Sequence, residues 1–446
     1  MNVAVIGGGL AGLVAARALV RAGVDARVFE AAERPGGVVG TTAIGGYVRE
    51  HAAGWFVGGP PDGALALCRE LGVAVDRASR RARRRWIYLD GKLRALPRSP
   101  QGLVTTDLLT WRGKLDLLRE PLRPAGHVAD ESVHAFAARR FGAEAARAIF
   151  SPLVTAIYAA DAHDISLAAG FPRLAALDAR GGIVRGLLVQ AVRGTAARLR
   201  GARPATTPRG LWAPRGGMQA MIDALAGELG PRLRRRAPVA RIEPADGGVR
   251  VDGARWDGAV LAIPAEDAVG LIGAPACGDL AHRLAAFHRA PAAQVYLGFP
   301  ASAVPHARDG AGVLVAQGED VRALGVAFDS TLWPDRAPAG HALVRCMFGG
   351  GRDPQITRLD DAALIAQATR DLGVALGVTA QPSHASVVRC PRGVAQYGLG
   401  HGDRVRDAVA VARSQRIVLA GADYRGPGLD ALCADAATIV AEVTAW

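Results

Sequence analysis

Short apolar runs alternate with amphipathic stretches along the chain, a pattern that predicts an α/β protein. Near the beginning, the run Val3–Ile6 predicts a parallel strand buried on both faces, LVAARALVRAG predicts a helix, and ARVFE predicts a second strand ending at Glu30. Near the end, RIVLAGADY predicts another buried strand and ALCADAATIVAEVTAW a closing helix. If these last elements complete the first unit, the chain starts and ends in one domain.

The middle of the chain changes character twice. Residues 61–76 predict a helix followed by a strand, and Arg85–Leu89 with the Asp-Gly turn after it predicts a hairpin. Residues 101–202 have a mainly helical pattern, whereas 203–265 and 290–350 alternate as strands do, with PVARIEP among the predicted strands. The sequence therefore predicts interleaved domains rather than consecutive ones.

A glycine fingerprint follows the first strand. Gly7-Gly8-Gly9-Leu10-Ala11-Gly12 lies between strand and helix, and Glu30 ends the second strand. In this arrangement Gly7 permits the tight turn, Gly9 lets the backbone approach a pyrophosphate, and Gly12 lets helix and strand pack closely. The N–H groups at the helix start can bind phosphate oxygens, and Glu30 can accept hydrogen bonds from a ribose hydroxyl. The sequence predicts a dinucleotide-binding domain.

The residues after Glu30 favour FAD over NAD. Glu33-Arg34-Pro35-Gly36-Gly37 extends the fingerprint into a second glycine turn, and residues 45–50 predict a hairpin arm. This extension resembles the flavoproteins of the amine oxidase superfamily, whose members bind FAD in an extended form. No second GxGxxG is present to hold a nicotinamide. We therefore expect FAD as the cofactor.

The charge balance leaves the partner class open. The 446 residues carry 54 basic and 41 acidic side chains, a formal charge of +13. Such a balance is typical of proteins that bind nucleic acid, a membrane surface or an acidic ligand. The lysines are only Lys92 and Lys114, so an arginine-rich composition explains the charge equally well. DNA binding is disfavoured because no nucleic-acid-binding module accompanies the charge.

Several kinds of chemistry are not indicated. The five cysteines are scattered without a CxxC pair, which argues against a disulfide framework or zinc finger and for a reducing compartment. No HxH or HExxH motif is present, so we predict no metal, and no GxSxG indicates a nucleophile. No apolar run reaches the ~18 residues of a membrane span, and no signal peptide is evident. The expectation is a soluble or peripherally membrane-bound protein.

Five further segments share a pattern with one flavoprotein family. They are Ser151–Asp161 with Ile165–Leu167 and Phe171-Pro172, Arg215–Gln219 with Asp223–Leu225, Val260–Ala265, Gln396-Tyr397 with Gly400-His401, and Leu419–Gly421 through Gly426–Leu429. In this order they are similar to GIYAGD…LS…FP, GGMQ…DAL, VLATPA, PQY…GH and LAG…GVGL of the oxygen-dependent protoporphyrinogen oxidases. The chain resembles that family over most of its length.

The resemblance implies a fold and a domain order. The expected fold class is α/β, with a Rossmann-like FAD-binding domain of the amine oxidase type interleaved with a mixed-sheet substrate domain and a helical membrane-facing domain. The FAD-binding domain is expected at 1–70, 203–265 and 401–446, the substrate domain at 71–100 and 266–400, and the helical membrane-associating domain at 101–202.

The resemblance also implies which residues hold FAD. Positions matching the pyrophosphate and adenosine-ribose contacts are Gly7, Gly8, Gly9, Leu10, Ala11, Gly12, Glu30 and Ala31. Positions matching the adenine contact, the second glycine turn and the flavin lining are Val239, Arg34, Gly36, Gly37, Val38, Ala52, Ala53, Gly54 and Trp55. Positions matching the flavin-ring end are Ala422, Pro427, Gly428 and Leu429, where the last helix points its N-terminus at the ring and stabilises negative charge on reduced flavin.

For the substrate, the resemblance implies protoporphyrinogen IX. Arg85 matches an arginine that pairs with a substrate propionate, and Gly312, Leu314 and Met347 match residues around the tetrapyrrole. In the family, hydride passes from a meso carbon to flavin N5 in three two-electron steps of haem biosynthesis, with O2 as acceptor and H2O2 as product. The cofactor carries this chemistry, so we predict no catalytic side chain.

Partners and location follow from the same resemblance. We expect porphyrinogen and O2 as partners together with an anionic membrane surface, and no nucleic acid; a homodimer is left open. The expected place is the cytoplasm, peripherally at the inner face of the cell membrane. Three other functions stay open: oxidation of coproporphyrinogen III, a diverged flavin amine oxidase or desaturase on another substrate, and a non-catalytic tetrapyrrole-binding flavoprotein.

Some positions depart from the family pattern. Ala52, Ala156 and Ala160 stand where the family has glycine, and Ala53 stands where it has proline. Ala311 stands where the family has an aromatic residue against the tetrapyrrole, so one stacking face is missing. These departures bear on the substrate more than on the fold or the cofactor.

Overall fold

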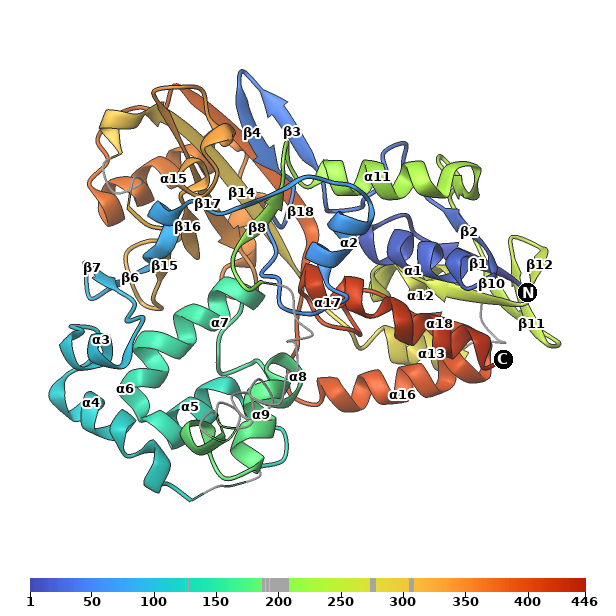
Figure 1. Cartoon of the computed structure of the whole chain (residues 1–446), viewed down its shortest axis with the longest axis horizontal. Helices are drawn as coiled ribbons and strands as arrows, with labels where there is room; N and C mark the ends of the chain where they lie inside the picture. The colour runs from blue at the N-terminus through green and yellow to red at the C-terminus, as the bar shows by residue number, and fades with distance from the viewer. Residues whose placement is uncertain are drawn as a thin grey trace.

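A parallel five-stranded sheet forms one end of the molecule in the computed structural model, which describes residues 1–124, 126, 128–186, 189, 192, 208–272, 278–304 and 309–446. Its strand order is β19-β13-β1-β2-β9. The strands are β1 (Asn2–Ile6), β2 (Asp25–Phe29), β9 (Leu233–Arg234), β13 (Gly258–Leu261) and β19 (Ile417–Leu419). Three widely separated parts of the sequence therefore build one sheet, and both chain ends lie at this end of the molecule (Figure 1).

Helices cover this sheet because each presents an apolar stripe to it. α1 (Leu10–Arg21) packs with α11 (Gln219–Leu229) and α18 (Ala436–Thr444) in one core with the strands. α16 (His401–Ser414) packs on β19, within the core that lies across the sheet. The glycine fingerprint thus lies at the carboxyl edge of β1, where α1 begins.

A mixed seven-stranded sheet forms the second unit, in the order β18-β14-β17-β16-β15-β6-β7. All neighbouring pairs are antiparallel except β15 and β6, which are parallel. The strands are β6 (Trp86–Leu89), β7 (Lys92–Ala95), β14 (Arg289–Pro300), β15 (Gly312–Val315), β16 (Gly325–Ala327), β17 (His341–Gly349) and β18 (His384–Ala395). α15 (Asp361–Leu376) packs on this sheet with its apolar face.

A layer of helices lies beside the second sheet (Figure 1). They are α3 (Pro100–Thr105), α4 (Trp111–Leu118), α5 (Val133–Phe141), α6 (Ala143–Ala145), a π-helical turn (Ala146–Phe150), α7 (Ser151–Tyr158), α8 (Leu167–Gly170) and α9 (Pro172–Ala179). The buried Arg140 guanidinium pairs with the buried Glu120 carboxylate, which also accepts the backbone N–H groups of Ile183 and Val184. Most of 187–202, also predicted helical, lies outside the described residues.

Smaller elements complete the described chain. The remaining strands are β3 (Thr41–Ile44), β4 (Tyr47–Glu50), β5 (Val75–Arg77), β8 (Trp212–Pro214), β10 (Ile242–Ala245), β11 (Gly248–Val251) and β12 (Ala254–Trp256). The remaining helices are α2 (Ala64–Glu70), α12 (Ala265–Leu271), α13 (Gly278–Leu284), α14 (Asp329–Leu332) and α17 (Leu429–Ala434). Short 3₁₀ turns are Arg80–Arg83, Glu120–Leu122, Gly230–Arg232, Ala301–Ala303, Pro334–Arg336 and Pro354–Arg358.

The predicted α/β fold class, with a nucleotide-binding unit interleaved with a mixed-sheet unit and a helical unit, is confirmed by these sheets. Two local predictions were wrong. The strand predicted in PVARIEP begins only at Ile242, because the N–H groups of Ala240 and Arg241 bind the Asp252 carboxylate instead of a strand. The closing helix is two helices, interrupted at Asp435, whose carboxylate faces Arg425 at 3.6 Å.

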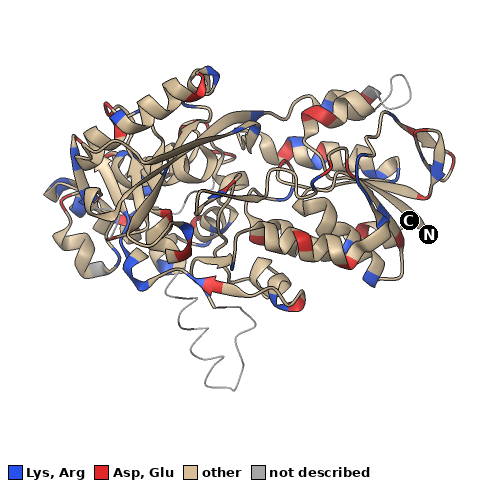
Figure 2. Ribbon diagram, turned by 90° about the horizontal axis from the view of Figure 1, so that it is seen from above, with Lys and Arg blue, Asp and Glu red and all other residues tan. Residues whose placement is uncertain are grey.

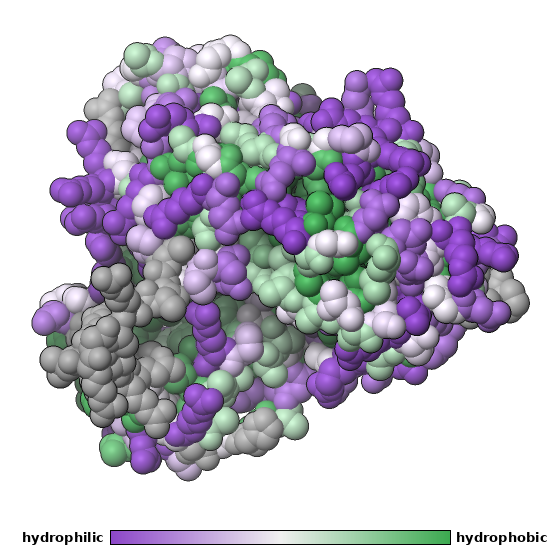
Figure 3. Space-filling model, turned by 45° about the vertical axis from the view of Figure 1, so that its right-hand side comes forward, coloured by the Kyte–Doolittle hydropathy of each residue, from purple (hydrophilic) through white to green (hydrophobic). Residues whose placement is uncertain are grey.

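Neither basic nor acidic residues are confined to one part of the molecule. Figure 2 shows basic and acidic positions interspersed along both the sheet-rich and the nucleotide-binding halves. On the face drawn in Figure 3, hydrophobic residues gather in a hollow bordered by hydrophilic ones. Within the part of the chain that the structure describes, no helix has the length and hydropathy of a bilayer-crossing segment.

One buried histidine should make stability depend on pH. His401, at the start of α16, stacks on Tyr397 with ring centroids 4.0 Å apart. Burial lowers its pKa from 6.5 to about 4, and the charge of Arg404 acts in the same direction. Because the unfolded chain then binds the proton more tightly, stability should fall as pH decreases from about 6.5 to about 4.

We expect His401→Phe, which keeps a stacking ring, to flatten this part of the curve of unfolding free energy against pH. Urea titrations at pH values between 4 and 7, followed by circular dichroism, measure it. The matched control is His341→Phe, at an exposed histidine. An unchanged slope in His401→Phe would contradict the assignment.

Candidate active site

The first glycine turn is shaped by close contacts that only glycine permits. Gly7 has φ +103°, and a Cβ at Gly12 would lie 1.9 Å from the Gly7 carbonyl oxygen. At Gly9, which caps α1, an added Cβ would meet nothing within 4 Å. The first turn of α1, which holds Leu10 and Ala11, carries no acidic side chain. Open space beside uncompensated N–H groups fits the pyrophosphate of a dinucleotide.

Glu30 is fixed at the carboxyl end of β2. One carboxylate oxygen accepts the Gly8 N–H at 2.7 Å, and the other accepts the Ala32 N–H at 2.7 Å. The neighbouring Ala31 is exposed, and the half-buried Val239 lies just beyond Ala237, whose N–H donates to the Glu30 carbonyl. The structure thus brings together the predicted ribose and adenine contacts, Glu30, Ala31 and Val239.

The second glycine turn is held by Arg34. Its guanidinium donates to the carbonyl oxygens of Gly37 at 2.6 Å and Val39 at 2.8 Å, and the Gly36 N–H donates to the Gly8 carbonyl at 2.7 Å. The predicted residues Gly36 and Gly37 therefore lie against the first turn. The Arg34 side chain organises the loop through its carbonyls.

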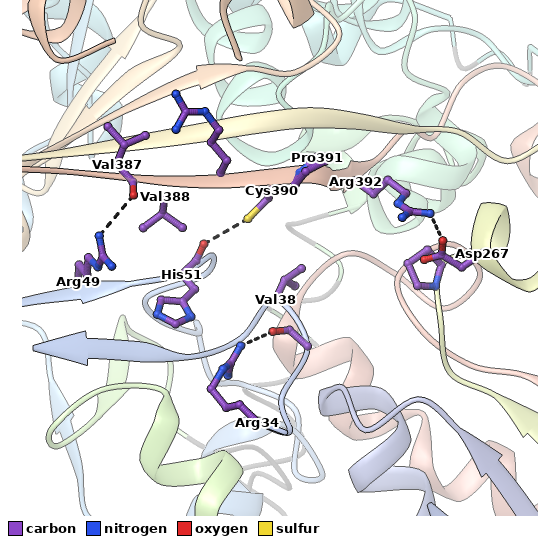
Figure 4. A pocket seen from close by; sticks show the side chains of 13 residues that line it. Arg34, Val38, Arg49, His51, Asp267, Val387, Val388, Cys390, Pro391 and Arg392 are labelled. Carbon is purple, nitrogen blue, oxygen red and sulfur yellow. Dashed lines mark hydrogen bonds and ion pairs between the residues drawn. The ribbon is translucent and has the colours of Figure 1, made fainter. Parts of the chain in front are cut away.

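Arg34, Gly37 and Val38 also line an open groove of about 570 Å³ (Figure 4). Its other wall is the strand β18, where the Cys390 thiol donates to the His51 carbonyl at 3.3 Å and Arg49 donates to the Val387 carbonyl. The groove joins the second glycine turn to the edge of the seven-stranded sheet. Val38, predicted to line the flavin, is 45% exposed here.

The predicted flavin-ring end lies in the loop before α17. Gly428 caps this helix, and a Cβ there would meet nothing within 4 Å, so the space beside the Gly428 backbone is open. The Tyr397 hydroxyl donates to the Ala422 carbonyl at 2.5 Å and accepts the Gly426 N–H at 2.9 Å. Tyr397 therefore fixes the loop on which these predicted contacts depend.

Asp430 joins this loop to the predicted flavin-lining segment 52–55. Its carboxylate accepts the N–H groups of Val57, Gly58 and Ala64, each at 3.0 Å. A carboxylate that accepts several backbone N–H groups is a strong tie between segments. The chain after Trp55 is thus held against the start of α17.

A buried guanidinium holds the same segment from the other sheet. Arg345, on β17, donates to the Ala52 carbonyl at 3.3 Å, to Gln294 Oε1 at 3.1 Å and to Asp329 Oδ1 at 3.0 Å. Its guanidinium carbon also lies 4.9 Å from the centre of the Trp55 ring. Residues Ala52, Ala53, Gly54 and Trp55 are therefore placed by a side chain of the seven-stranded sheet.

The carboxylates of this region have raised pKa values. Burial raises the pKa of Asp329, and the charges of Arg345 and Arg336 oppose the rise. Burial likewise raises the pKa of Glu50, against the charge of Arg336 at 3.2 Å and a hydrogen bond from Thr41. Two arginines facing two carboxylates balance the charge of this buried network.

The four predicted substrate residues line one cavity of about 320 Å³. Arg85, Gly312, Leu314 and Met347 meet there with Trp55, which was predicted to line the flavin. The complete lining is Trp55, Val57, Arg85, Leu153, Ala156, Ile157, Leu211, Ala311, Gly312, Val313, Leu314, Val326, Ala327 and Met347. The helix α7, the strands β15, β16 and β17 and the segment after β4 therefore form one mostly apolar chamber.

Arg85 is the charged side chain of this chamber. It is exposed, and among the described residues it has no ion-pair partner, whereas its neighbour Arg84 pairs with Asp309 at 2.5 Å. Gly312 has φ +154°, and a Cβ there would lie 2.1 Å from the Val326 carbonyl oxygen, so glycine is needed for β15 to approach β16. The geometry suits a mainly apolar ligand that carries a carboxylate.

Three residues of this site escaped the sequence analysis. Arg345 and Gln294 are hydrogen-bonded to each other from different strands of the seven-stranded sheet. Asp430 binds backbone N–H groups that lie more than three hundred residues before it in the sequence. The signal for Arg345 was a charged residue inside the apolar strand LVRCMF, and the signal for Asp430 was an acid in the first turn of a helix. In the described ranges, no cluster of three His, Cys, Asp or Glu side chains is placed to bind a metal.

Comparisons with known proteins give a consistent result. The family model "Flavin containing amine oxidoreductase" matches residues 10–431. The chain is 32% identical over 454 residues to a coproporphyrinogen III oxidase of Mycobacterium leprae, covering 97% of this chain and 96% of the relative. It is 31% identical over 468 residues to a protoporphyrinogen oxidase of Homo sapiens, covering 95% and 94%. A crystal structure of a protein from Exiguobacterium sp. 255-15 superposes on this chain with a TM-score of 0.82 at 23% identity, covering 99% of this chain and 98% of that protein.

These findings confirm three predictions from the sequence: the family resemblance, the fold class and FAD as the cofactor. The glycine turns, Glu30 and the open backbone at Gly9 and Gly428 fit such a cofactor. The family match covers nearly the whole chain, from the first turn of α1 to α17. The chain belongs to the flavin containing amine oxidoreductases.

Proposed function

We propose that this protein oxidises protoporphyrinogen IX to protoporphyrin IX with FAD as cofactor and O2 as electron acceptor. The observation that carries the proposal is the chamber of Arg85, Gly312, Leu314 and Met347, which is apolar apart from one guanidinium. The names of the relatives from Mycobacterium leprae and Homo sapiens support a porphyrinogen as the substrate class. In overall balance, one porphyrinogen and three O2 would give one porphyrin and three H2O2.

Coproporphyrinogen III is the second candidate, favoured by the name of the Mycobacterium leprae relative. It carries four carboxylates where protoporphyrinogen IX carries two. Burying a carboxylate without a cationic partner is costly. Arg85 is the one cationic side chain among the described residues that line the chamber, and this favours the substrate with fewer carboxylates.

The chain's own residues bind and orient rather than react. When bound, FAD supplies the two-electron acceptor for each oxidation step. Arg85 would pair with a propionate, and the aliphatic walls of Leu314, Met347 and Ile157 would exclude water from the macrocycle. Arg345 and Asp430 hold the chain around residues 52–58, and this would keep the cofactor and the chamber in a fixed relative position.

The direct test is oxidation of freshly reduced porphyrinogens in air. We expect the FAD-loaded protein to produce porphyrin fluorescence and H2O2 faster from protoporphyrinogen IX than from coproporphyrinogen III. Anaerobic addition of substrate should bleach the flavin absorbance. Rates no higher than those of enzyme-free autoxidation for both substrates would overturn the proposal, and a faster rate with coproporphyrinogen III would select the second candidate.

Arg85→Leu should raise KM for the porphyrinogen at least about tenfold, with a smaller effect on kcat. A hydrogen bond to a charged group contributes about 1.5–3 kcal/mol, and a factor of ten corresponds to about 1.4 kcal/mol. Arg85→Lys should recover part of the loss, because lysine keeps the charge but not the bidentate geometry. Arg83→Leu, in the same exposed arginine run and outside the chamber lining, is the matched control. Equal KM values in Arg85→Leu and the control would exclude this contact.

We further propose that the helical unit binds an anionic membrane surface. Exposed apolar side chains gather on α4 and the turn after it: Trp111 is 71% exposed, Leu118 64% and Leu122 84%. The basic residues Arg112 and Arg119 are exposed beside them. An aromatic and apolar patch with adjacent cations is typical of interfacial membrane binding.

The double variant Trp111→Ser/Leu118→Ser should bind anionic vesicles at least about tenfold more weakly than the unchanged protein. Each replacement removes an apolar side chain worth roughly 1.5–3 kcal/mol when fully buried. Cosedimentation with vesicles containing phosphatidylserine measures the binding. Val374→Ser, at an exposed apolar position on α15, is the control. Equal binding of both variants would contradict the proposed patch.

A further inference from the structure

The chamber has one aromatic side chain among the described residues that line it, and this is Trp55. Ala311, on another wall of the chamber, offers no ring to a ligand. The structure puts Ala311 and Trp55 in the same chamber and in the same apolar cluster, with Trp333 and Leu211. Any ring-to-ring contact between the described chamber lining and an aromatic ring of a ligand would therefore be made by Trp55.

We propose that Trp55 is the specificity-determining residue that stacks on a pyrrole ring of the substrate. The inference rests on the proposed function and names a contact of that same site. Each pyrrole of a porphyrinogen is aromatic, although the methylene bridges interrupt conjugation. An offset or edge contact between two aromatic rings contributes beyond the area it buries.

The Trp55 indole has two buried neighbours that support it. The Arg345 guanidinium carbon lies 4.9 Å from the ring centre, within the range of a cation–π contact. The Trp333 ring centre lies 5.7 Å away, with the planes tilted by 31°. Arg345 and Trp333 are 2% and 4% exposed, so both supports are buried, while Trp55 is only partly buried.

A supported aromatic ring is more useful for recognition than a free one. Because Arg345 is itself fixed by Asp329 and Gln294, the indole loses little further freedom when a ligand packs on it. Arg85 in the same chamber can fix a carboxylate of the ligand while Trp55 contacts a ring. Two contacts of different kind orient a macrocycle better than either alone.

The test measures binding of protoporphyrin IX to the FAD-loaded protein. Trp55→Leu should raise Kd about five- to tenfold, since a stacked pair contributes about 0.5–1.5 kcal/mol beyond burial. Trp55→Phe, which keeps an aromatic ring, should raise it no more than about threefold. Trp446→Phe is the matched control, because Trp446 lies against Gly258 of the five-stranded sheet and outside the chamber lining. The flavin absorbance of each variant verifies that it is equally loaded.

A second variant tests whether an aromatic ring at position 311 can replace the ring of Trp55. Adding Ala311→Phe to Trp55→Leu should return Kd to within about threefold of the unchanged protein. Unaltered binding by Trp55→Leu, or equal losses in Trp55→Leu and Trp55→Phe, would overturn the stacking role. If the protein oxidises porphyrinogens while these variants bind normally, only this inference fails. If the unchanged protein neither oxidises porphyrinogens nor binds protoporphyrin IX, the proposed function fails.

Discussion

A buried guanidinium ties the seven-stranded sheet to the segment that follows β4, next to the Trp55 wall of the chamber. Arg345 extends from β17 of the seven-stranded sheet and donates to the carbonyl oxygen of Ala52, in the chain that leaves the nucleotide-binding unit. It also lies over the Trp55 ring. Gln294 donates to the same carbonyl, Trp333 lies against the Trp55 ring, and Asp430 holds the residues that follow the segment. Arg345 is thus one of several contacts that place the segment 52–55 between the nucleotide-binding unit and the chamber.

Such a charge is stable in the interior only with a partner. Asp329 supplies it at 3.0 Å, and its second carboxylate oxygen has no hydrogen-bond partner among the described residues. Removing one member of a buried pair leaves the other charge uncompensated, which typically costs about 3–5 kcal/mol. Arg336 and Glu50 form a second pair close by, and Tyr296 connects Glu50 to Gln294. Burying these charges costs desolvation free energy, but their hydrogen bonds and ion pairs fix the geometry around Arg345.

The sequence predicted best those parts that are encoded locally. The strand, glycines, helix and terminal Glu30 lie within thirty residues, and the roles of Gly7, Gly9 and Gly12 follow from their places in the fingerprint. The chamber residues Arg85, Gly312 and Met347 were found through the family resemblance, and the structure brings them together. Arg345 and Asp430 could not be found this way, because their partners are set by how the sheets pack. The break at Asp435 escaped for a similar reason, since Arg425 lies in a separate loop.

Ala52, where the family resemblance led us to expect glycine, makes its hydrogen bonds to Gln294 and Arg345 through the backbone. At Ala52 the contacting group is the carbonyl oxygen, which accepts from Gln294 and Arg345, and an alanine offers it as well as a glycine does. Gly54 is different, because a Cβ there would lie 3.4 Å from an Arg345 nitrogen and 3.1 Å from Glu50 Cγ. A Cβ at this position would therefore be crowded against Glu50, whereas its distance from the guanidinium would be that of an ordinary contact. The close approach of Glu50 therefore explains glycine at position 54, whereas position 52 accepts alanine.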